Sequence, residues 1–482
     1  MIKPDLETAR ELARGHSLLP ISLELYADLK TPVEALRVIA AEGHEAYILE
    51  SAPGGESWSR YTFLGYKPLM EVSGRGDRVL IREGGRTSVR EGDPHALLKE
   101  LAAARTSPKI PGAPPFTGGF VGYFAYEYFA NIERTLRLTD NDETGMDDFR
   151  LLLFDKVIVF DHFKQTVSLI ANIPTADLER SYINGVTELK DMERLLLSRA
   201  DGPSAPSASA AEFSPSFSKE AFGAAVEKIK WHIREGDVFQ CVPSVRFTAP
   251  HKGGLLEVYR KLRTTNPSAY MFYIRFDGLE LAGASPETLV SLRNGLVSTY
   301  PLAGTCPRFE DDAKTAEHVA RMLADEKELA EHDMLVDLGR NDLGKVCKFG
   351  TVKVEEYRGV KKLSQVCHIA SKVTGELAEG FDPLDVMAAV LPAGTLSGAP
   401  KKRACEIIDE VEGTRRGVYG GAVGYMDFSG NMDLCIGIRM AALKDGLAYV
   451  QAGAGIVADS VPEKEYEECL RKAAAVLQAF GA

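Results

Sequence analysis

The sequence has few cysteines and no pattern that would join them. Its seven cysteines are an odd number, and no CxxC pair occurs among them, so a disulfide framework or a zinc site is not expected. No apolar run approaches the roughly 18 residues that span a bilayer. The start of the chain also lacks the apolar segment of a secretory signal. We therefore predict a cytoplasmic protein with reduced cysteines and no membrane contact.

The sequence also lacks an excess of positive charge. Lysine and arginine total 57 against 69 aspartates and glutamates, a net charge of −12, which argues against nucleic acid as a partner. The chain contains no P-loop, and residues 453–456 (GAGI) lack the GxGxxG spacing of a dinucleotide site. With 482 residues of ordinary globular composition, the chain is long enough for two or three domains.

Strand-like runs and helical patterns alternate along the chain, with one change in composition near its middle. Residues 201–216 are rich in proline, serine and alanine, which indicates a linker. We therefore predict an N-terminal domain over 1–200, the linker over 201–216 and a second domain over 217–482. Runs of strands with interleaved helices predict an α+β fold, in which antiparallel sheets form a sandwich flanked by helices.

Two pairs of glutamates are spaced to share a helical face. Glu328 and Glu331 lie in a predicted helix that ends near Gly339, and Glu465 and Glu468 lie in the C-terminal helix. Brought together, two such faces would form an oxygen-rich pocket that suits Mg²⁺. The spacing alone equally describes solvated helix faces with ordinary charge pairs, which is the commoner situation for glutamate.

Other residues suited to a polar ligand are spread over the second half of the chain. Arg439 on a predicted strand and Lys472 on the last helix could each bind a carboxylate, arginine in bidentate fashion. The backbone N–H groups of residues 453–455 could bind a small carboxylate as well. Glu287 follows a proline in a predicted turn, and His368 lies in an alternating strand. Taken singly, each has an ordinary structural explanation, such as a surface charge or a structural histidine.

Eight segments in a fixed order carry more information than any single residue. They are PLAGT, EHDMLVDLGRND, CHIAS, LPAGTLSGAPK, VYGGAVGY, CIGIRM, QAGAGIV and PEKEYEECLRKA, all within residues 301–473. Their order and wording resemble the chorismate-utilising enzymes, and within them the family of anthranilate synthase large subunits. The resemblance covers nearly the whole chain.

The resemblance implies roles for residues at matching positions. Glu331 and Glu468 match two ligands of Mg²⁺, with Glu328 and Glu465 beside them. Glu287 matches a general acid. Further positions match substrate-binding or active-site residues, namely Gly304, Thr305, Tyr419, Arg439, Gly453, Ala454, Gly455, Lys472, His368, Thr395 and Gln240.

A tryptophan feedback site is implied in the same way. Leu49, Glu50 and Ser51 match one wall of that site, and residues 266–273, with Ala269, Tyr270 and Met271, match the other. Glu50 and Ser51 are expected to bind the ammonium and nearby polar groups of tryptophan, and Met271 to pack on its indole. The family usually has proline where this chain has Ala269.

The implied activity is the conversion of chorismate and ammonia to anthranilate and pyruvate, the first step of tryptophan biosynthesis. Because no amidotransferase motif with a nucleophilic cysteine is present, we expect a separate glutamine amidotransferase subunit, anthranilate synthase component II, in a heterotetramer of two large and two small subunits.

Three alternatives share this scaffold. Isochorismate and salicylate synthases carry lysine at the position of Gln240, and aminodeoxychorismate synthases carry lysine at that of Ala303. Gln240 has no amine to activate water, and Ala303 offers no nucleophile, so we favour anthranilate as the product. The third alternative is a non-catalytic protein that binds tryptophan.

Overall fold

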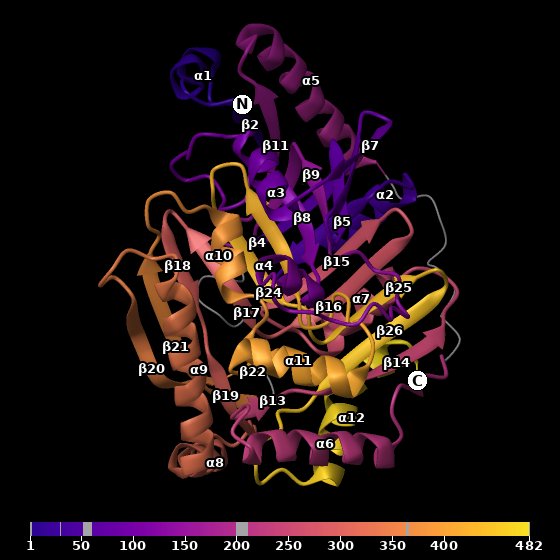
Figure 1. Ribbon diagram of the computed structural model, residues 1–482. Coiled ribbons are helices and arrows are strands. Elements are labelled where there is room, and N and C mark those ends of the chain that lie inside the picture. Colours follow the sequence, from indigo (N-terminus) through magenta and orange to yellow (C-terminus); the bar gives the residue numbers. More distant parts are fainter. Residues whose placement is uncertain (1, 29, 52–59, 199–210, 363–365, 482) are drawn as a thin grey trace.

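The computed structural model describes residues 2–28, 30–51, 60–198, 211–362 and 366–481, which form two large antiparallel sheets with helices around them (Figure 1). The predicted α+β fold is confirmed. Among the helices described, none combines the length and apolarity needed to cross a membrane.

The first sheet has twelve strands that come from both halves of the chain. In spatial order they are β1 (Ile2–Lys3), β2 (Leu18–Tyr26), β11 (Thr166–Pro174), β10 (Lys156–Asp161), β4 (Tyr61–Tyr66), β3 (Ala46–Glu50), β15 (Tyr270–Phe276), β16 (Leu279–Ser285), β25 (Met440–Lys444), β26 (Leu447–Gly453), β14 (Ser244–Pro250) and β12 (Ser214–Pro215).

The second sheet also mixes the two halves. Its order is β19 (Leu302–Pro307), β21 (Val366–Glu376), β18 (Leu296–Thr299), β17 (Thr288–Arg293), β24 (Met432–Ile436), β23 (Ala422–Asp427), β8 (Gly119–Phe124), β9 (Phe149–Phe154), β5 (Met70–Arg75), β6 (Arg78–Glu83) and β7 (Arg86–Glu91), and β20 (Lys353–Lys362) also pairs with β21. A short pair, β13 (Gln240–Cys241) with β22 (Gly398–Ala399), lies apart from both sheets.

The two predicted domains therefore share both sheets. β3 pairs with β15 in the first sheet, and β8 pairs with β23 in the second. Of the predicted linker, residues 201–210 lie outside the described residues, whereas Ser214–Pro215 forms β12 at the edge of the first sheet. The division at 201–216 remains a prediction about the order of segments along the chain, and strands from both sides of it pair within each sheet.

Three apolar cores hold the layers together. Buried side chains from both sheets, such as Tyr47, Phe154, Phe272 and Val423, pack in the space between the sheets. The outer face of the first sheet is covered by helices that include α2, α5, α6, α7 and α12. The outer face of the second sheet is covered by α3, α9 and α10. Burial of apolar area on both faces of each sheet explains why most strands lack a polar face.

The helices follow the sequence patterns closely. They are α1 (Leu6–Leu12), α2 (Pro32–Ala41), α3 (Pro94–Ala103), α4 (Phe129–Ile132), α5 (Leu178–Leu197), α6 (Lys219–Arg234), α7 (Leu256–Thr265), α8 (Asp312–Ala324), α9 (Glu326–Gly344), α10 (Pro383–Val390), α11 (Lys401–Glu412) and α12 (Pro462–Ala479), with single 3₁₀ turns at Tyr126–Tyr128 and Gly394–Leu396.

One helix boundary differs from the prediction. The helix with the first glutamate pair, α9, continues to Gly344 instead of ending near Gly339. Its start is fixed by Asp325, whose carboxylate accepts the N–H groups of Lys327 and Glu328. At Gly339 a Cβ would lie 3.1 Å from Thr299 Cγ2, so glycine here lets the helix pass close to the second sheet without ending it.

Candidate active site

The predicted site residues meet where α9 and α12 approach the ends of strands from both sheets. Lys472 on α12 donates from Nζ to the carbonyl oxygen of Gly453 at 3.1 Å. The Arg439 guanidinium donates to the carbonyl oxygen of Lys472. The two predicted carboxylate-binding cations thus lie side by side next to the end of β26.

Arg439 differs from the prediction in its backbone. It lies in the connection between β24 and β25 instead of within a strand, and its φ is 51°. A non-glycine residue with positive φ is uncommon and often marks a functional position. Because Arg439 lies outside the strands, its backbone can adopt this conformation, which turns the guanidinium toward α12.

Glu287 lies at the point where the chain leaves the first sheet and enters the second, between β16 and β17. Burial raises the pKa of its carboxyl group, and the charges of Lys472 and Arg439 and a hydrogen bond from Thr395 partly oppose this. Thr395 Oγ1 donates to Glu287 Oε2 at 3.2 Å. A carboxyl group with a raised pKa can donate a proton to a leaving oxygen near neutral pH.

Glu468 has the opposite electrostatic setting on α12. Lys472 lies 3.3 Å from one of its oxygens and Arg471 lies 2.7 Å from the other. Although burial opposes it, these two cations lower the pKa of the Glu468 carboxyl group. This carboxylate therefore stays ionised at neutral pH, as a metal ligand must. Glu465 lies one turn earlier on the same helix and is partly exposed.

The glutamate pair on α9 lies beside the strand that carries Gln240. Burial and the nearby charge of Glu331 raise the pKa of Glu328. The Gln240 amide donates to Glu331 Oε1 at 3.4 Å, while the buried Oε1 of Gln240 has no partner among the described residues.

The acidic side chains offer the donor type that Mg²⁺ needs. Within the described part of the chain, no three His, Cys, Asp or Glu side chains are grouped to hold a metal ion. Mg²⁺ is usually bound by one or two carboxylates together with substrate and water oxygens, so this ion does not require a closed cluster of protein ligands. The repulsion that raises the pKa of Glu328 would also be relieved by a cation.

His368 and the Gly304–Thr305 segment come from paired strands, β21 and β19. His368 Nδ1 lies 3.0 Å from the carbonyl oxygen of Gly304 and 3.1 Å from Thr305 Oγ1. Because a carbonyl oxygen only accepts, the ring proton belongs on Nδ1, and Nε2 is left to accept a proton. Burial, with the charges of Lys361 and Arg439, lowers the pKa of His368, which keeps the ring neutral.

The glycine segment after β26 has no room for side chains. A Cβ on Gly453 would lie 2.8 Å from the Tyr419 hydroxyl, and one on Gly455 would lie 2.6 Å from Gln240 Nε2. These glycines therefore bring Tyr419 and Gln240 against the backbone. One expectation fails here, because the Ala454 N–H donates to the carbonyl oxygen of Pro243 at 3.1 Å and is not free to bind a ligand.

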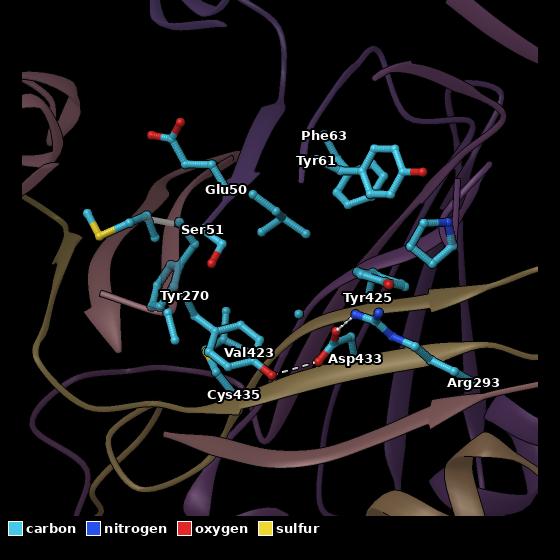
Figure 2. Close-up of a pocket in the computed structure, with 16 residues that line it drawn as sticks. Glu50, Ser51, Tyr61, Phe63, Tyr270, Arg293, Val423, Tyr425, Asp433 and Cys435 are labelled. Carbon is cyan, nitrogen blue, oxygen red and sulfur yellow. Dashed lines mark hydrogen bonds and ion pairs between the residues drawn. The ribbon is translucent and has the colours of Figure 1, made fainter. Parts of the chain in front are cut away.

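A cavity lies between the two sheets (Figure 2). The six residues predicted to bind tryptophan, Leu49, Glu50, Ser51, Ala269, Tyr270 and Met271, are all among those that line it. Ser51 Oγ is buried and has no partner among the described residues. Its hydroxyl therefore needs a hydrogen-bond partner, which a polar ligand can supply.

Glu50 and Met271 are placed differently from the expectation. The Glu50 side chain turns away from the cavity (Figure 2), and its carboxylate accepts Arg263 Nε at 2.5 Å and the Tyr259 hydroxyl. Met271 is the cross-strand partner of Glu50 and packs in the core on the helix side of the first sheet. Successive strand residues alternate between faces, so the side chains of Ser51 and Tyr270 point into the cavity. Those of Glu50 and Met271, which also border it, point to the helix side of the sheet.

Sequence reasoning missed the polar floor of this cavity. Asp433 on β24 accepts the Tyr270 hydroxyl at 2.8 Å and Arg293 Nη2 at 2.8 Å. Asp433 is buried, with 7% of its surface exposed. The one signal was an acidic residue inside an otherwise apolar strand, MDLCI, which is expensive unless the charge is paired.

Comparisons with known proteins agree with this geometry. A family model described as chorismate binding enzyme matches residues 45–478. Anthranilate synthase component 1 of Acetivibrio thermocellus is 42% identical, with 100% of this chain and 99% of that protein covered. The protein of the same name from Pseudomonas aeruginosa is also 42% identical, over 98% of this chain and 97% of that protein.

Solved structures give the same result. The crystal structure of anthranilate synthase component I from Streptococcus pneumoniae has a TM-score of 0.79 and 35% identity, over 94% of this chain and 99% of that chain. The menaquinone-specific isochorismate synthase from Escherichia coli has a TM-score of 0.72 at 18% identity, over 98% of this chain and 99% of that chain. This second likeness shows the fold alone.

Proposed function

The chain belongs to the chorismate-binding enzymes and, within them, to the anthranilate synthase component 1 family, and from this premise we propose that it converts chorismate and ammonia to anthranilate and pyruvate. The observation that carries the proposal is the meeting of Glu287, Arg439 and Lys472 with Gln240 in place of a basic nucleophile activator. This set can bind an acid, protonate a leaving group and admit ammonia.

The two cations are suited to the carboxylates of chorismate. Arg439 presents a planar fork that matches a carboxylate, and Lys472 presents a point charge. Burial lowers the pKa of Arg439, and Glu287, Tyr419 and Glu468 partly oppose this. Within the described segments, the hydrogen bond of this half-buried arginine goes to a backbone carbonyl oxygen, so an incoming anion would give its charge a partner.

Glu287 acts as the acid that protonates the departing C4 hydroxyl. Hydroxide is a poor leaving group, so this proton is needed as the C–O bond breaks. Mg²⁺ held by Glu331 and Glu468, with Glu328 and Glu465 beside them, would polarise the ring carboxylate as a Lewis acid.

Ammonia attacks C2 through its own lone pair. Gln240 orients it, because its buried, unpartnered Oε1 can accept one N–H. Ala303 on β19 has no amine that could compete for the ring. His368 then removes the C2 proton at Nε2 as pyruvate leaves, which makes the ring aromatic.

A separate subunit supplies the ammonia from glutamine. All seven cysteines of this chain are buried, whereas a nucleophilic cysteine must be accessible and of low pKa. We propose a glutamine amidotransferase partner in a heterotetramer of two large and two small subunits. Unpaired, buried cysteines also support a reducing compartment such as the cytoplasm.

The cavity between the sheets is proposed to bind L-tryptophan as a feedback inhibitor. Aromatic side chains such as Tyr61, Phe63 and Tyr270 line it, and they suit an indole. Asp433 supplies a carboxylate for the ammonium end, and the Ser51 hydroxyl and the Arg293 guanidinium beside Asp433 can donate to the carboxylate end.

The reaction is tested by its product. The purified chain with chorismate, Mg²⁺ and ¹⁵N-ammonium at alkaline pH is expected to give anthranilate labelled at the C2 amino group, read by mass spectrometry and NMR. Glutamine should replace ammonium only after a partner subunit is added. Label at C4, isochorismate or salicylate as the main product, or no turnover would contradict the proposal.

The acidic residues are tested at one position on each helix. Glu331→Gln and Glu468→Gln keep size and remove charge, and the loss of several kcal/mol of charge stabilisation predicts a fall of about 100-fold or more in kcat/KM. Glu467→Gln is the matched control, since Glu467 is exposed on α12. Near-parent activity of both test variants at low Mg²⁺ would refute the assignment.

The acid is tested through the pH profile. Thr395→Val removes a hydrogen bond that lowers the pKa of Glu287, so that pKa rises further. Because the acid works only when protonated, the alkaline limb of kcat/KM should move to higher pH. Thr395→Ser retains the hydroxyl and should keep the parent profile. A limb that stays in place or moves to lower pH counts against Glu287 as the acid.

The feedback site is tested by filling the cavity. Ser51→Phe places a ring where tryptophan is proposed to lie, so inhibition should disappear while uninhibited turnover persists. Coupling between such sites typically changes affinity by about 5–150-fold, which steady-state assays with and without tryptophan resolve. The proposal fails if tryptophan does not inhibit the parent, or if the variant is inhibited as strongly as the parent.

A further inference from the structure

The cavity between the two sheets, proposed above to bind tryptophan, is called the effector cavity below. It and the proposed acid Glu287 lie on opposite sides of a wall made by the paired strands β17 and β24. Asp433 and Cys435 of β24 line the effector cavity. Thr288, the first residue of β17, and Ile436, the last residue of β24, line a separate hollow next to Glu287 and Thr395. The wall between the two is therefore a single sheet thick.

One side chain of the first sheet reaches this wall from the cavity. Tyr270 lines the effector cavity, and its hydroxyl is hydrogen-bonded to Asp433 at 2.8 Å and to Thr288 Oγ1 at 3.2 Å. Thr288 directly follows Glu287 in the chain. The phenol thus connects the cavity with the residue next to the catalytic carboxyl group.

The backbone of Glu287 is held by the same neighbours. Its carbonyl oxygen accepts the Ile436 N–H at 3.0 Å. Ser285 Oγ, two residues earlier, donates to the carbonyl oxygen of Ile436 at 2.8 Å, and Ser285 is the cross-strand partner of Tyr270. In addition, the register between β17 and β24 shifts between Thr288 and Val290, so the ladder is irregular just after Glu287.

We propose that Tyr270 is a positioning residue for Glu287, and that an effector in the cavity inhibits by drawing the Tyr270 hydroxyl away from Thr288. The side-chain bond compensates for the irregular ladder and fixes the start of β17. Without it, the segment that carries Glu287 loses one of its restraints, and the carboxyl group is less well placed for proton transfer. This inference rests on the proposed function and specifies how its regulation reaches the site.

An effector needs little movement to break this bond. The phenol already contacts the cavity, and Asp433 beside it is the charged group of the cavity floor. A ligand that pairs with Asp433 or packs on the Tyr270 ring would bind with different strength to the protein with the Tyr270–Thr288 hydrogen bond and to the protein without it. Such differential interaction is what allows a ligand to shift an equilibrium.

Tyr270→Phe and Thr288→Val test the link, because each removes one hydroxyl and keeps the shape. Both variants are expected to lower kcat by roughly 5-fold or more, with KM for chorismate within about twofold of the parent, since positioning of an acid matters in the transition state. The kcat of the double variant should be no lower than that of the less active single variant, because both substitutions remove the same hydrogen bond. Tyr270→Phe should still bind radiolabelled L-tryptophan in equilibrium dialysis but be inhibited at least about 5-fold less.

Two matched variants separate this effect from loss of a buried hydroxyl in general. Thr288→Ser keeps the hydroxyl and should restore parent kcat. Tyr47→Phe removes a hydroxyl from the same core between the sheets, where it has no partner among the described residues, and should not change kcat. Rates are expressed per folded protein, measured by circular dichroism.

The outcomes are distinguishable. Parent-like kcat and full inhibition in Tyr270→Phe, or losses that multiply in the double variant, would overturn the link while leaving the enzyme assignment intact. If the parent enzyme is active but tryptophan does not inhibit it, the proposed inhibition through Tyr270 is refuted. The kcat values of Tyr270→Phe and Thr288→Val would then still decide whether Tyr270 positions Glu287. A parent that makes no anthranilate would overturn the proposed function and this link together.

Discussion

The passage of the chain from one sheet to the other at Pro286 and Glu287 is the constraint on which the site depends. β16 ends in the first sheet at Ser285, and β17 begins in the second at Thr288. The carboxyl group proposed as the acid is thus attached to both sheets within a single turn. The sheets are kept at a set separation by the close-packed core between them, so small changes in that core bear directly on the position of this group.

Two carboxyl groups at the site have opposite pKa shifts, although both are partly buried and near the same lysine. Glu468 has Lys472 and Arg471 within ion-pair distance, and these contacts keep it ionised. Glu287 receives only a threonine hydrogen bond at 3.2 Å together with more distant charge, so burial dominates and favours its protonated form. Environment alone therefore separates a cation-binding carboxylate from a proton donor.

The sequence predicted which residues meet but not how each one is oriented. Ordered motifs grouped Glu287, Arg439 and Lys472, and the structure places these residues near one another, because motif order reflects a whole fold. The alternation of side chains along a strand predicts that Glu50 and Ser51 point to opposite faces of the sheet. Which of the two points into the cavity depends on the position of helix α7, whose Tyr259 and Arg263 bind Glu50. The run FRLLLFDKVIVFD reads as one strand, yet it divides at Asp155 between the two sheets. The direction of a side chain and the division of a strand depend on pairing partners far along the chain, which the local sequence pattern does not reveal.

The sharing of both sheets between distant segments also affects how the chain can fold during synthesis. β3, near the start, has β15 as a neighbour, and β8 has β23. When the first 200 residues have left the ribosome, both sheets still have unpaired edges at these strands, and such edges can pair with other chains. Neither sheet is complete until the C-terminal strands arrive, which makes this a fold of distant contacts that forms slowly and late. The architecture that shares both sheets between distant segments thus leaves the growing chain dependent on protection of its strand edges.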